Sequence, residues 1–200
     1  MSKKGDKGGV DKKAAADAID AFLRAIGRDP AGDPALLETG ARVADAFVDD
    51  LCRGYEVDVH ALLAANVIAR SPEGLGASTE IVIVRDLAVT TTCPHHLMAA
   101  WGTATVAFAP RDKLLGIGAV GSVVDAFAQR LALQEEIGAN VASALAVTLE
   151  PVWVACRLVL SHSCMTARGE RRHGASVETI SVAGAADRGL VHRVLGVSAS

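Results

Sequence analysis

Residues 80–96 read EIVIVRDLAVTTTCPHH, and this stretch sets the kind of fold that the rest of the chain must complete. Its first part, residues 80–92, is rich in β-branched side chains and partly alternates in polarity, which predicts a strand. Pro94 has no backbone N–H to donate to a sheet ladder, so we expect the strand to end beside it. The strand therefore delivers a cysteine and two histidines to its end.

Towards the C-terminus, strand patterns and helix patterns follow one another in pairs. Residues 102–109 alternate in polarity and predict a second strand. Residues 121–149 have helical texture with an interruption near 131–134, which predicts two helices. Residues 151–161 and 175–182 predict two more strands. The order hairpin, two helices, hairpin indicates an α+β fold with a predominantly antiparallel sheet and helices on one face.

The N-terminal third has only helical patterns. Residues 12–27 and 34–54 each place apolar side chains on one helical face, and a short helix is expected around 60–68. We divide the chain into a disordered tail (1–12), an N-terminal helical region (13–70) and the domain that contains the sheet (71–200). The tail is assigned from its mixture of lysine, glycine and aspartate.

Composition narrows the possible partners and surroundings. The 200 residues carry a net charge of only −3, so no basic field suggests nucleic acid as a partner. No run approaches the roughly 18 consecutive apolar residues of a membrane span, and no signal-peptide pattern is present. We therefore expect a cytoplasmic protein without a membrane partner. In that setting the four cysteines favour metal binding or burial over disulfides.

Two clusters of metal-binding residue types follow two of the predicted strands. Thiolate and imidazole are preferred ligands of Zn²⁺, and a catalytic zinc site uses three protein ligands and one open position. Cys93 and His96 are three residues apart, which suits one turn, and Cys164 would complete the set. His95 and His162 would then remain beside the metal as acid–base groups. Taken alone, each cluster is also compatible with a buried cysteine beside surface histidines.

The other two cysteines suggest a different role. Cys52 and Cys156 lie in apolar runs, on a predicted helix and a predicted strand. Because a free cysteine packs as a small hydrophobic side chain, we expect both in the core.

Five segments, in order along the chain, resemble motifs of the GTP cyclohydrolase I family. They are residues 38–44 (ETGARVA), 92–96 (TCPHH), 102–110 (GTATVAFAP), 127–135 (FAQRLALQE) and 162–169 (HSCMTARG). The resemblance extends from about residue 36 to 183, and the five motifs together are specific. It implies the tunnelling fold and a ring-shaped homo-oligomer with sites between subunits.

The resemblance also implies roles for individual residues. It implies a Zn²⁺ cofactor with Cys93, His96 and Cys164 as ligands, and His95 and His162 as catalytic histidines.

The same resemblance implies residues for the substrate. Glu135 matches the carboxylate that holds the guanine edge, with Gln134 beside it, and Arg42 and Arg168 match cations of the substrate site. A carboxylate accepts two hydrogen bonds from adjacent N–H groups of a purine, so the role is chemically sensible. Without the motif, Glu135 would be interpreted as a solvated helix charge.

The chain departs from the family where the triphosphate would bind. The family's Gly-Leu-Ser-Lys-x-x-Arg is here GIGAVGS, so Gly118, Ala119 and Ser122 replace serine, lysine and arginine. Asp45 stands where a lysine is usual. Losing three cationic contacts costs on the order of 5 kcal/mol, or thousands-fold in affinity. Arg171 and Arg172 are cations that can compensate.

These observations give a leading hypothesis and its rivals. We expect zinc-dependent hydrolysis of a C–N bond that opens the five-membered ring of a purine-like substrate. The substrate would lack the triphosphate, as a free purine, a nucleoside or an 8-oxo purine such as urate or 8-oxoguanine does. One rival is GTP cyclohydrolase I activity, which converts GTP to 7,8-dihydroneopterin triphosphate. Others are a non-catalytic ring protein that binds zinc and pterins, and a ring subunit in which zinc is only structural.

Overall fold

The structure is a computed structural model that describes residues 9–70, 80–169 and 171–196. It divides into two compact units, Met1–Arg53 and Gly54–Ser200. Most of the tail expected at residues 1–12 lies outside the described residues, although Lys12 already belongs to a helix. The boundary expected between residues 70 and 71 falls at the edge of another segment that is not described.

The N-terminal unit is helical, as expected. Helix α1 spans Lys12–Ala25, helix α2 spans Thr39–Asp45, and a π-helical segment, η1, continues it over Ala46–Leu51. The expected helix start at residue 34 is wrong. Glu38 adopts a left-handed conformation with φ 60°, which a helix cannot include, so α2 begins one residue later.

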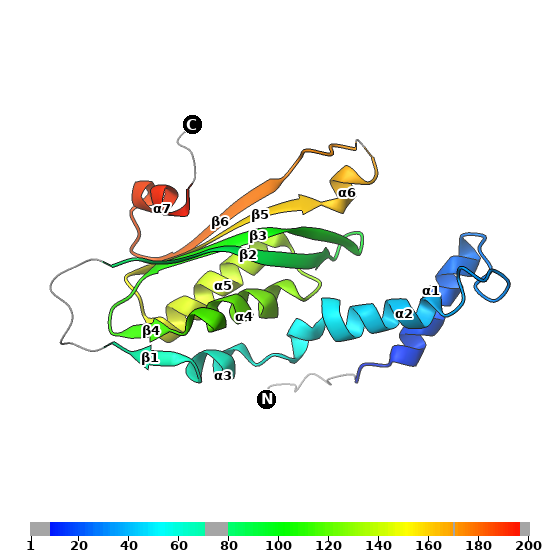
Figure 1. The fold of residues 1–200 in the computed structure, drawn as a ribbon, viewed down its shortest axis with the longest axis horizontal. Helices are drawn as coiled ribbons and strands as arrows, with labels where there is room; N and C mark the ends of the chain where they lie inside the picture. The colour runs from blue at the N-terminus through cyan, green and yellow to red at the C-terminus, as the bar shows by residue number, and fades with distance from the viewer. Residues whose placement is uncertain (1–8, 71–79, 170, 197–200) are drawn as a thin grey trace, which may run out of the picture. The chain divides into compact units, whose positions relative to one another are not determined.

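The C-terminal unit is built on a four-stranded antiparallel sheet (Figure 1). Its strands are β2 (Val82–Cys93), β3 (Met98–Ala109), β5 (Trp153–His162) and β6 (Val177–Gly184), in the spatial order β2-β3-β5-β6. All four predicted strands are confirmed. β3 begins before residue 102 because the turn after β2 is short enough for Met98 to pair with Cys93.

Short elements that carry little sequence signal complete the unit. They are the 3₁₀ turn η2 (Arg53–Glu56), helix α3 (Val59–Ala64), the paired strands β1 (Val67–Ala69) and β4 (Lys113–Leu115), the single turn α6 (Ser163–Thr166) and helix α7 (Arg188–Leu195). Of these, α3 confirms the short helix expected around residues 60–68, and the others were not predicted. Except for α7 they have only three or four residues, too few to establish a periodic pattern.

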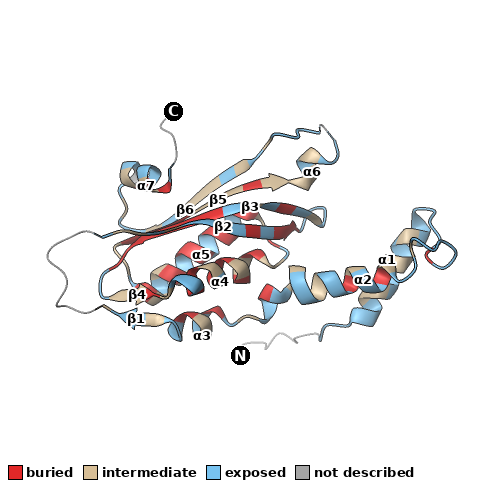
Figure 2. Ribbon diagram, in the orientation of Figure 1, coloured by how far each residue is buried: buried red, intermediate tan, exposed pale blue. Residues whose placement is uncertain are grey.

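Helices α4 (Ile117–Ala128) and α5 (Gln134–Leu149) cover one face of the sheet, which confirms the expected α+β arrangement (Figure 1). The main core lies between them and the sheet, where buried residues concentrate (Figure 2). Its fully buried members include Val106, Phe108, Val123, Ile137, Leu145, Cys156 and Leu158. Cys156 therefore lies in the core as expected, whereas Cys52, also expected there, is only partly buried. Within the described residues, no helix combines the length and apolar character needed to cross a membrane.

A β-bulge in β2 decides which side chains face the helices. Val84 pairs with Val106 and Leu87 with Ala104, so β2 advances three residues while β3 advances two. The extra residue inverts the alternation along the rest of β2. Cys93 consequently lies on the helix-covered face at the end of the strand.

Gly138 allows α5 to lie close against β6. A Cβ atom at this position would lie 2.9 Å from Ser181 Oγ, closer than side chains normally approach. Gly138 is one helical turn after Gln134 and shares its face of α5. The close approach at Gly138 therefore also brings Gln134 against the sheet.

Helix α7 packs on the opposite face, near one end of the sheet. Val191 and Leu195 are buried against Ala107 and Trp153, which form a second, smaller core. The sequence analysis did not predict this helix.

The packing of α5 gives a stability prediction. Ile137→Ala should lower the free energy of unfolding by about 2–5 kcal/mol, because it removes buried apolar contacts and leaves a cavity. Ser143→Ala, an exposed position on the same helix, should change it by less than about 0.5 kcal/mol. Urea unfolding followed by circular dichroism would measure both variants. Equal effects would contradict the packing of Ile137 described above.

Candidate active site

The first part of the site is the turn between β2 and β3. Cys93 ends β2 and is buried, and the turn that follows exposes His95 and His96. The Leu97 N–H donates to the Cys93 carbonyl at 2.9 Å, which closes the turn around Pro94. The two imidazole rings lie edge to face, with their centroids 6.4 Å apart. A tight turn therefore holds one thiol and two imidazoles together.

The second part is the end of β5. His162 is the last residue of the strand and pairs with Ala100, and α6 then carries Cys164. Ser163 Oγ donates to the Ala99 carbonyl at 2.6 Å, which ties α6 to β3. Because β3 is antiparallel to both β2 and β5, the start of β3 brings the two clusters to the same end of the sheet.

The third part is the N-terminus of α5, where Gln134 is only 3% exposed. Its Nε2 donates to the Leu158 carbonyl at 3.2 Å, the Val177 carbonyl at 2.9 Å and Thr179 Oγ1 at 3.2 Å. Its Oε1 lies 2.8 Å from His162 Nε2. Gln134 therefore connects α5 to β5, to β6 and to one predicted catalytic histidine.

The two glutamates that follow Gln134 differ in what they contact. Glu136 Oε2 accepts the Leu133 N–H at 3.1 Å, so Glu136 caps the helix. Glu135 is exposed and makes no hydrogen bond or ion pair with any residue that the structure describes. Glu135 is therefore the carboxylate of the pair that is available to a ligand.

These three parts enclose one pocket of about 310 Å³. Seven predicted site residues line it: Cys93, His95, His96, Gln134, Glu135, His162 and Cys164. Thr91, Leu133 and Val177 also line it and were missed by the sequence analysis. They come from three separate elements and belong to no residue class that signals a site, so only the fold identifies them.

The pocket contains side chains of the types that bind a zinc ion. Cys93, His96 and Cys164 share the pocket, and two thiolates with one imidazole are a chemically suitable set. Across the described parts of the chain, however, no three His, Cys, Asp or Glu side chains are gathered closely enough to form a ready-made cluster. The residues fit zinc by their chemistry and shared location.

The two arginines from the resemblance lie outside the lining of this pocket. Arg168 is exposed in the turn after α6. Arg42 is exposed in the N-terminal unit, where its Nη2 donates to Thr39 Oγ1 at 3.2 Å and its Nη1 lies 4.0 Å from a Glu38 carboxylate oxygen.

The substituted phosphate-binding positions belong to the first half of α4. Ser122 Oγ donates to the Gly118 carbonyl at 3.2 Å, and Ala119 is 6% exposed. Lys113, just before α4, pairs with Glu150, just after α5, at 2.6 Å. The start of α4 therefore lies beside the end of α5, about 24 Å along that 16-residue helix from Gln134.

Burial and pairing alter the acid–base properties of groups outside the pocket. Burial raises the pKa of the Cys156 thiol to about 12, which suits an inert core residue. The hydrogen bond from Arg157 lowers the pKa of the Glu178 carboxyl.

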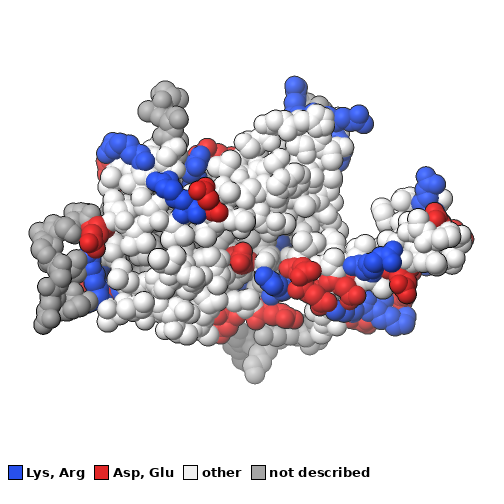
Figure 3. Space-filling view, viewed as in Figure 1, with Lys and Arg blue, Asp and Glu red and all other residues white. Residues whose placement is uncertain are grey.

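Charged side chains are sparse on the sheet region shown in Figure 3, where broad uncharged surface separates them.

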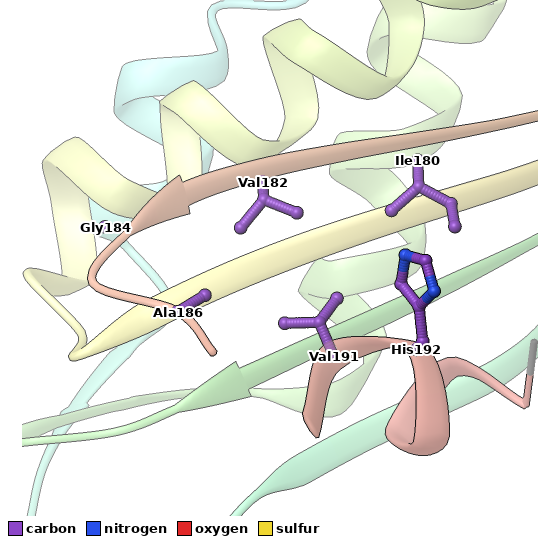
Figure 4. A pocket seen from close by; sticks show the side chains of 6 residues that line it. All are labelled: Ile180, Val182, Gly184, Ala186, Val191 and His192. Atoms are coloured by element: carbon purple, nitrogen blue, oxygen red, sulfur yellow. The ribbon is translucent and has the colours of Figure 1, made fainter. Parts of the chain in front are cut away.

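A second pocket of about 490 Å³ lies between β6 and α7 (Figure 4). Ile180, Val182 and Val191 give it an apolar lining, and His192 is the one titratable residue among those that line it. It lacks thiols and carboxylates, so the pocket at the end of β2 and β5 is the better candidate for catalysis.

An antiparallel α+β domain with thiols, imidazoles and a carboxylate around one pocket is typical of an enzyme that uses acid–base and metal chemistry. The family model described as GTP cyclohydrolase I matches residues 15–195. The chain belongs to the GTP cyclohydrolase I family.

Curated relatives agree with this assignment. A protein of Allorhizobium ampelinum named GTP cyclohydrolase 1 is 35% identical over 86% of this chain and 83% of its own length. A protein of the same name from Leptospira biflexa is 34% identical over 83% of this chain and 86% of its own length. Another, from Bartonella henselae, is 36% identical over 86% of this chain and 80% of its own length. The solved apo structure of an archaeosine synthase QueF-Like matches with a TM-score of 0.44 and 18% identity, over 55% of this chain and 99% of that chain.

Proposed function

We propose that this chain hydrolyses the five-membered ring of GTP and forms 7,8-dihydroneopterin triphosphate. The observation that carries the proposal is the single pocket that Cys93, His162, Cys164 and Glu135 line from four separate elements, β2, β5, α6 and α5. The relatives that share most of the chain's length are named GTP cyclohydrolase 1, which favours GTP as the substrate.

Glu135 is the group proposed to hold the base. Guanine presents adjacent N–H groups on one edge, and a carboxylate accepts two such hydrogen bonds at once. Glu136 is occupied as the helix cap, whereas Glu135 is exposed to the pocket without a partner among the described residues. A base held in this way would lie beside the N-terminus of α5, where the positive end of the helix dipole also favours the carboxylate.

His162 and His95 are proposed as the acid–base groups. Hydrolysis adds water to the ring carbon between two nitrogens and breaks one C–N bond, and the departing nitrogen must take up a proton. An imidazole that titrates near neutral pH can donate that proton. Both histidines line the pocket, one from the β2–β3 turn and one from the end of β5.

Cys93, His96 and Cys164 are the residues proposed to hold a zinc ion. The support is their shared pocket and the match between their donor atoms and the preferences of zinc. Bound there, zinc would supply Lewis-acid activation of water at neutral pH. Proton transfer would then belong to His162 and His95, and recognition of the base to Glu135.

We also propose that the site is completed between copies in a ring-shaped homo-oligomer. Gly118, Ala119 and Ser122 on α4 do not line the pocket within one chain, which favours completion of the site by another copy. β2 and β6 each keep one edge without a strand partner among the described residues, and such edges favour pairing with another strand. Arg42 and Arg168 are proposed to supply phosphate contacts in such an assembly.

A second candidate is the opening of a purine that carries fewer phosphates. The observation that favours it is the absence of the family's lysine and arginine at Ala119 and Ser122. Glycine and serine carry no charge, and the Ser122 hydroxyl already donates to the Gly118 carbonyl, so neither position offers a cation to an anionic ligand.

An activity assay separates these candidates. The purified protein should release formate from GTP, and His162→Ala should lower kcat by about 100-fold or more because a proton donor is lost. His60→Ala, an exposed histidine outside the pocket, should retain the wild-type rate. If guanosine or guanine is opened and GTP is not, the second candidate replaces the first.

Metal analysis tests the proposed ligand set. Wild-type protein should contain about one zinc per chain, and Cys93→Ser or Cys164→Ser should lose most of it because the thiolate is the stronger zinc ligand. Cys52→Ser, which removes a thiol from the N-terminal unit, serves as the matched control and should keep its zinc. Full zinc content in both pocket variants would exclude the assignment.

Restoring one cation tests the role of the α4 positions. Ser122→Arg should lower the KM for GTP about 10-fold or more, since a charge-assisted hydrogen bond contributes about 1.5–3 kcal/mol. The KM for guanosine should not change, and Ser122→Gln should have little effect on either. The gain should shrink as ionic strength rises. Ala119 is a poorer position for this test because it is packed in the core. Equal gains with guanosine would refute a phosphate contact at Ser122.

A further inference from the structure

The side-chain amide of Gln134 can adopt only one orientation in this fold. Its Nε2 faces the main-chain carbonyl oxygens of Leu158 and Val177, at 3.2 and 2.9 Å. Carbonyl oxygens only accept hydrogen bonds, so the amide NH₂ must point towards them. Rotating the amide by 180° would place Oε1 against two acceptors in a buried site, which is costly. The network therefore fixes Oε1 on the side of His162.

The fixed amide in turn determines where His162 carries its proton. Oε1 of Gln134 lies 2.8 Å from Nε2 of the imidazole, and an amide oxygen can only accept. Nε2 must then carry a hydrogen. Nδ1 makes no hydrogen bond with any residue that the structure describes. The second ring nitrogen is thus the one left to exchange protons.

We propose that Gln134 is a positioning residue that locks His162 in its Nε2–H form, so that proton transfer in the pocket takes place only at Nδ1. This inference rests on the proposed role of His162 as an acid–base group. It assigns Gln134 a different task from base recognition, because its buried amide is already fully engaged by the protein.

The arrangement suits a histidine that must both donate and accept a proton. The neutral Nε2–H form and the imidazolium both keep a hydrogen on Nε2, so the bond to Gln134 persists in each. Only the Nδ1–H neutral form would break it. The ring can then gain and lose a proton without turning, and the nitrogen that reacts keeps its place.

Nitrogen-15 magic-angle-spinning NMR of histidine-labelled, purified wild-type protein tests this directly, because it distinguishes protonated from unprotonated ring nitrogens. At about pH 8.5, where an ordinary imidazole is neutral, His162 should show a protonated Nε2 and an unprotonated Nδ1. A His162→Gln sample identifies the signals. A wild-type spectrum with the hydrogen on Nδ1 overturns the proposal, whatever the variants do.

Two variants separate orientation from packing. Gln134→Met keeps the length of the side chain but removes the acceptor, and should give a mixture of both neutral forms. Thr179→Val removes one acceptor of the Gln134 amide NH₂ and leaves its two carbonyl partners. The amide should keep its orientation, so His162 should keep its hydrogen on Nε2. An unchanged spectrum in Gln134→Met, or a mixture in Thr179→Val, would contradict the mechanism.

Kinetics provide a readout that a purely structural role would not give. Gln134→Met should lower kcat about 10-fold, with less than a twofold change in KM. A Gln134→Met variant in which KM rises and kcat is unchanged would point to base binding instead. The NMR result does not depend on turnover, so a protein inactive with GTP would refute the proposed function and leave the hydrogen-bond assignment to be decided by the spectrum.

Discussion

The antiparallel pairing of β3 with β5 is the constraint on which the rest of the molecule depends. β3 is the second strand of one hairpin and β5 the first strand of the other, and ten residue pairs from Ala100↔His162 to Ala109↔Trp153 join them. This register aligns the end of β5 with the start of β3. The residues after β5 therefore lie beside the turn between β2 and β3, and two clusters that are almost 70 residues apart in sequence reach the same pocket. A one-residue slip of this pairing would turn His162 to the other face of the sheet.

Two smaller features refine what the central pairing achieves. The bulge after Val84 inverts the alternation of β2 and brings Cys93 to the face covered by α4 and α5. The missing side chain at Gly138 lets α5 approach the sheet, so that Gln134 reaches carbonyl groups of β5 and β6 as well as His162. The pocket is thus assembled by the same contacts that close the core.

The residues that match or replace motif residues of the GTP cyclohydrolase I family fall into two groups in this chain. The pocket residues gather around the start of α5, whereas Gly118, Ala119 and Ser122 lie in the first half of α4. None of these three positions lines the pocket, so they can change without altering its lining.

The sequence by itself determined the elements with a strong period and the chemistry of the pocket. Four strands and the pair α4 and α5 follow from side-chain alternation and helical spacing, and Cys93, His95, His96, His162 and Cys164 are recognisable as metal-binding or acid–base types. The start of α2 at Thr39 was not predictable, because one left-handed residue, Glu38, leaves no pattern. The elements of three or four residues were missed because they are too short to show a period, and α7 was missed as well. Tertiary structure alone decided that Glu136 caps a helix while Glu135 faces the pocket, and that Gln134 bonds to His162. Those outcomes depend on which face of a strand or helix meets its neighbour, and that is fixed by register, a bulge and close packing between residues far apart in the chain.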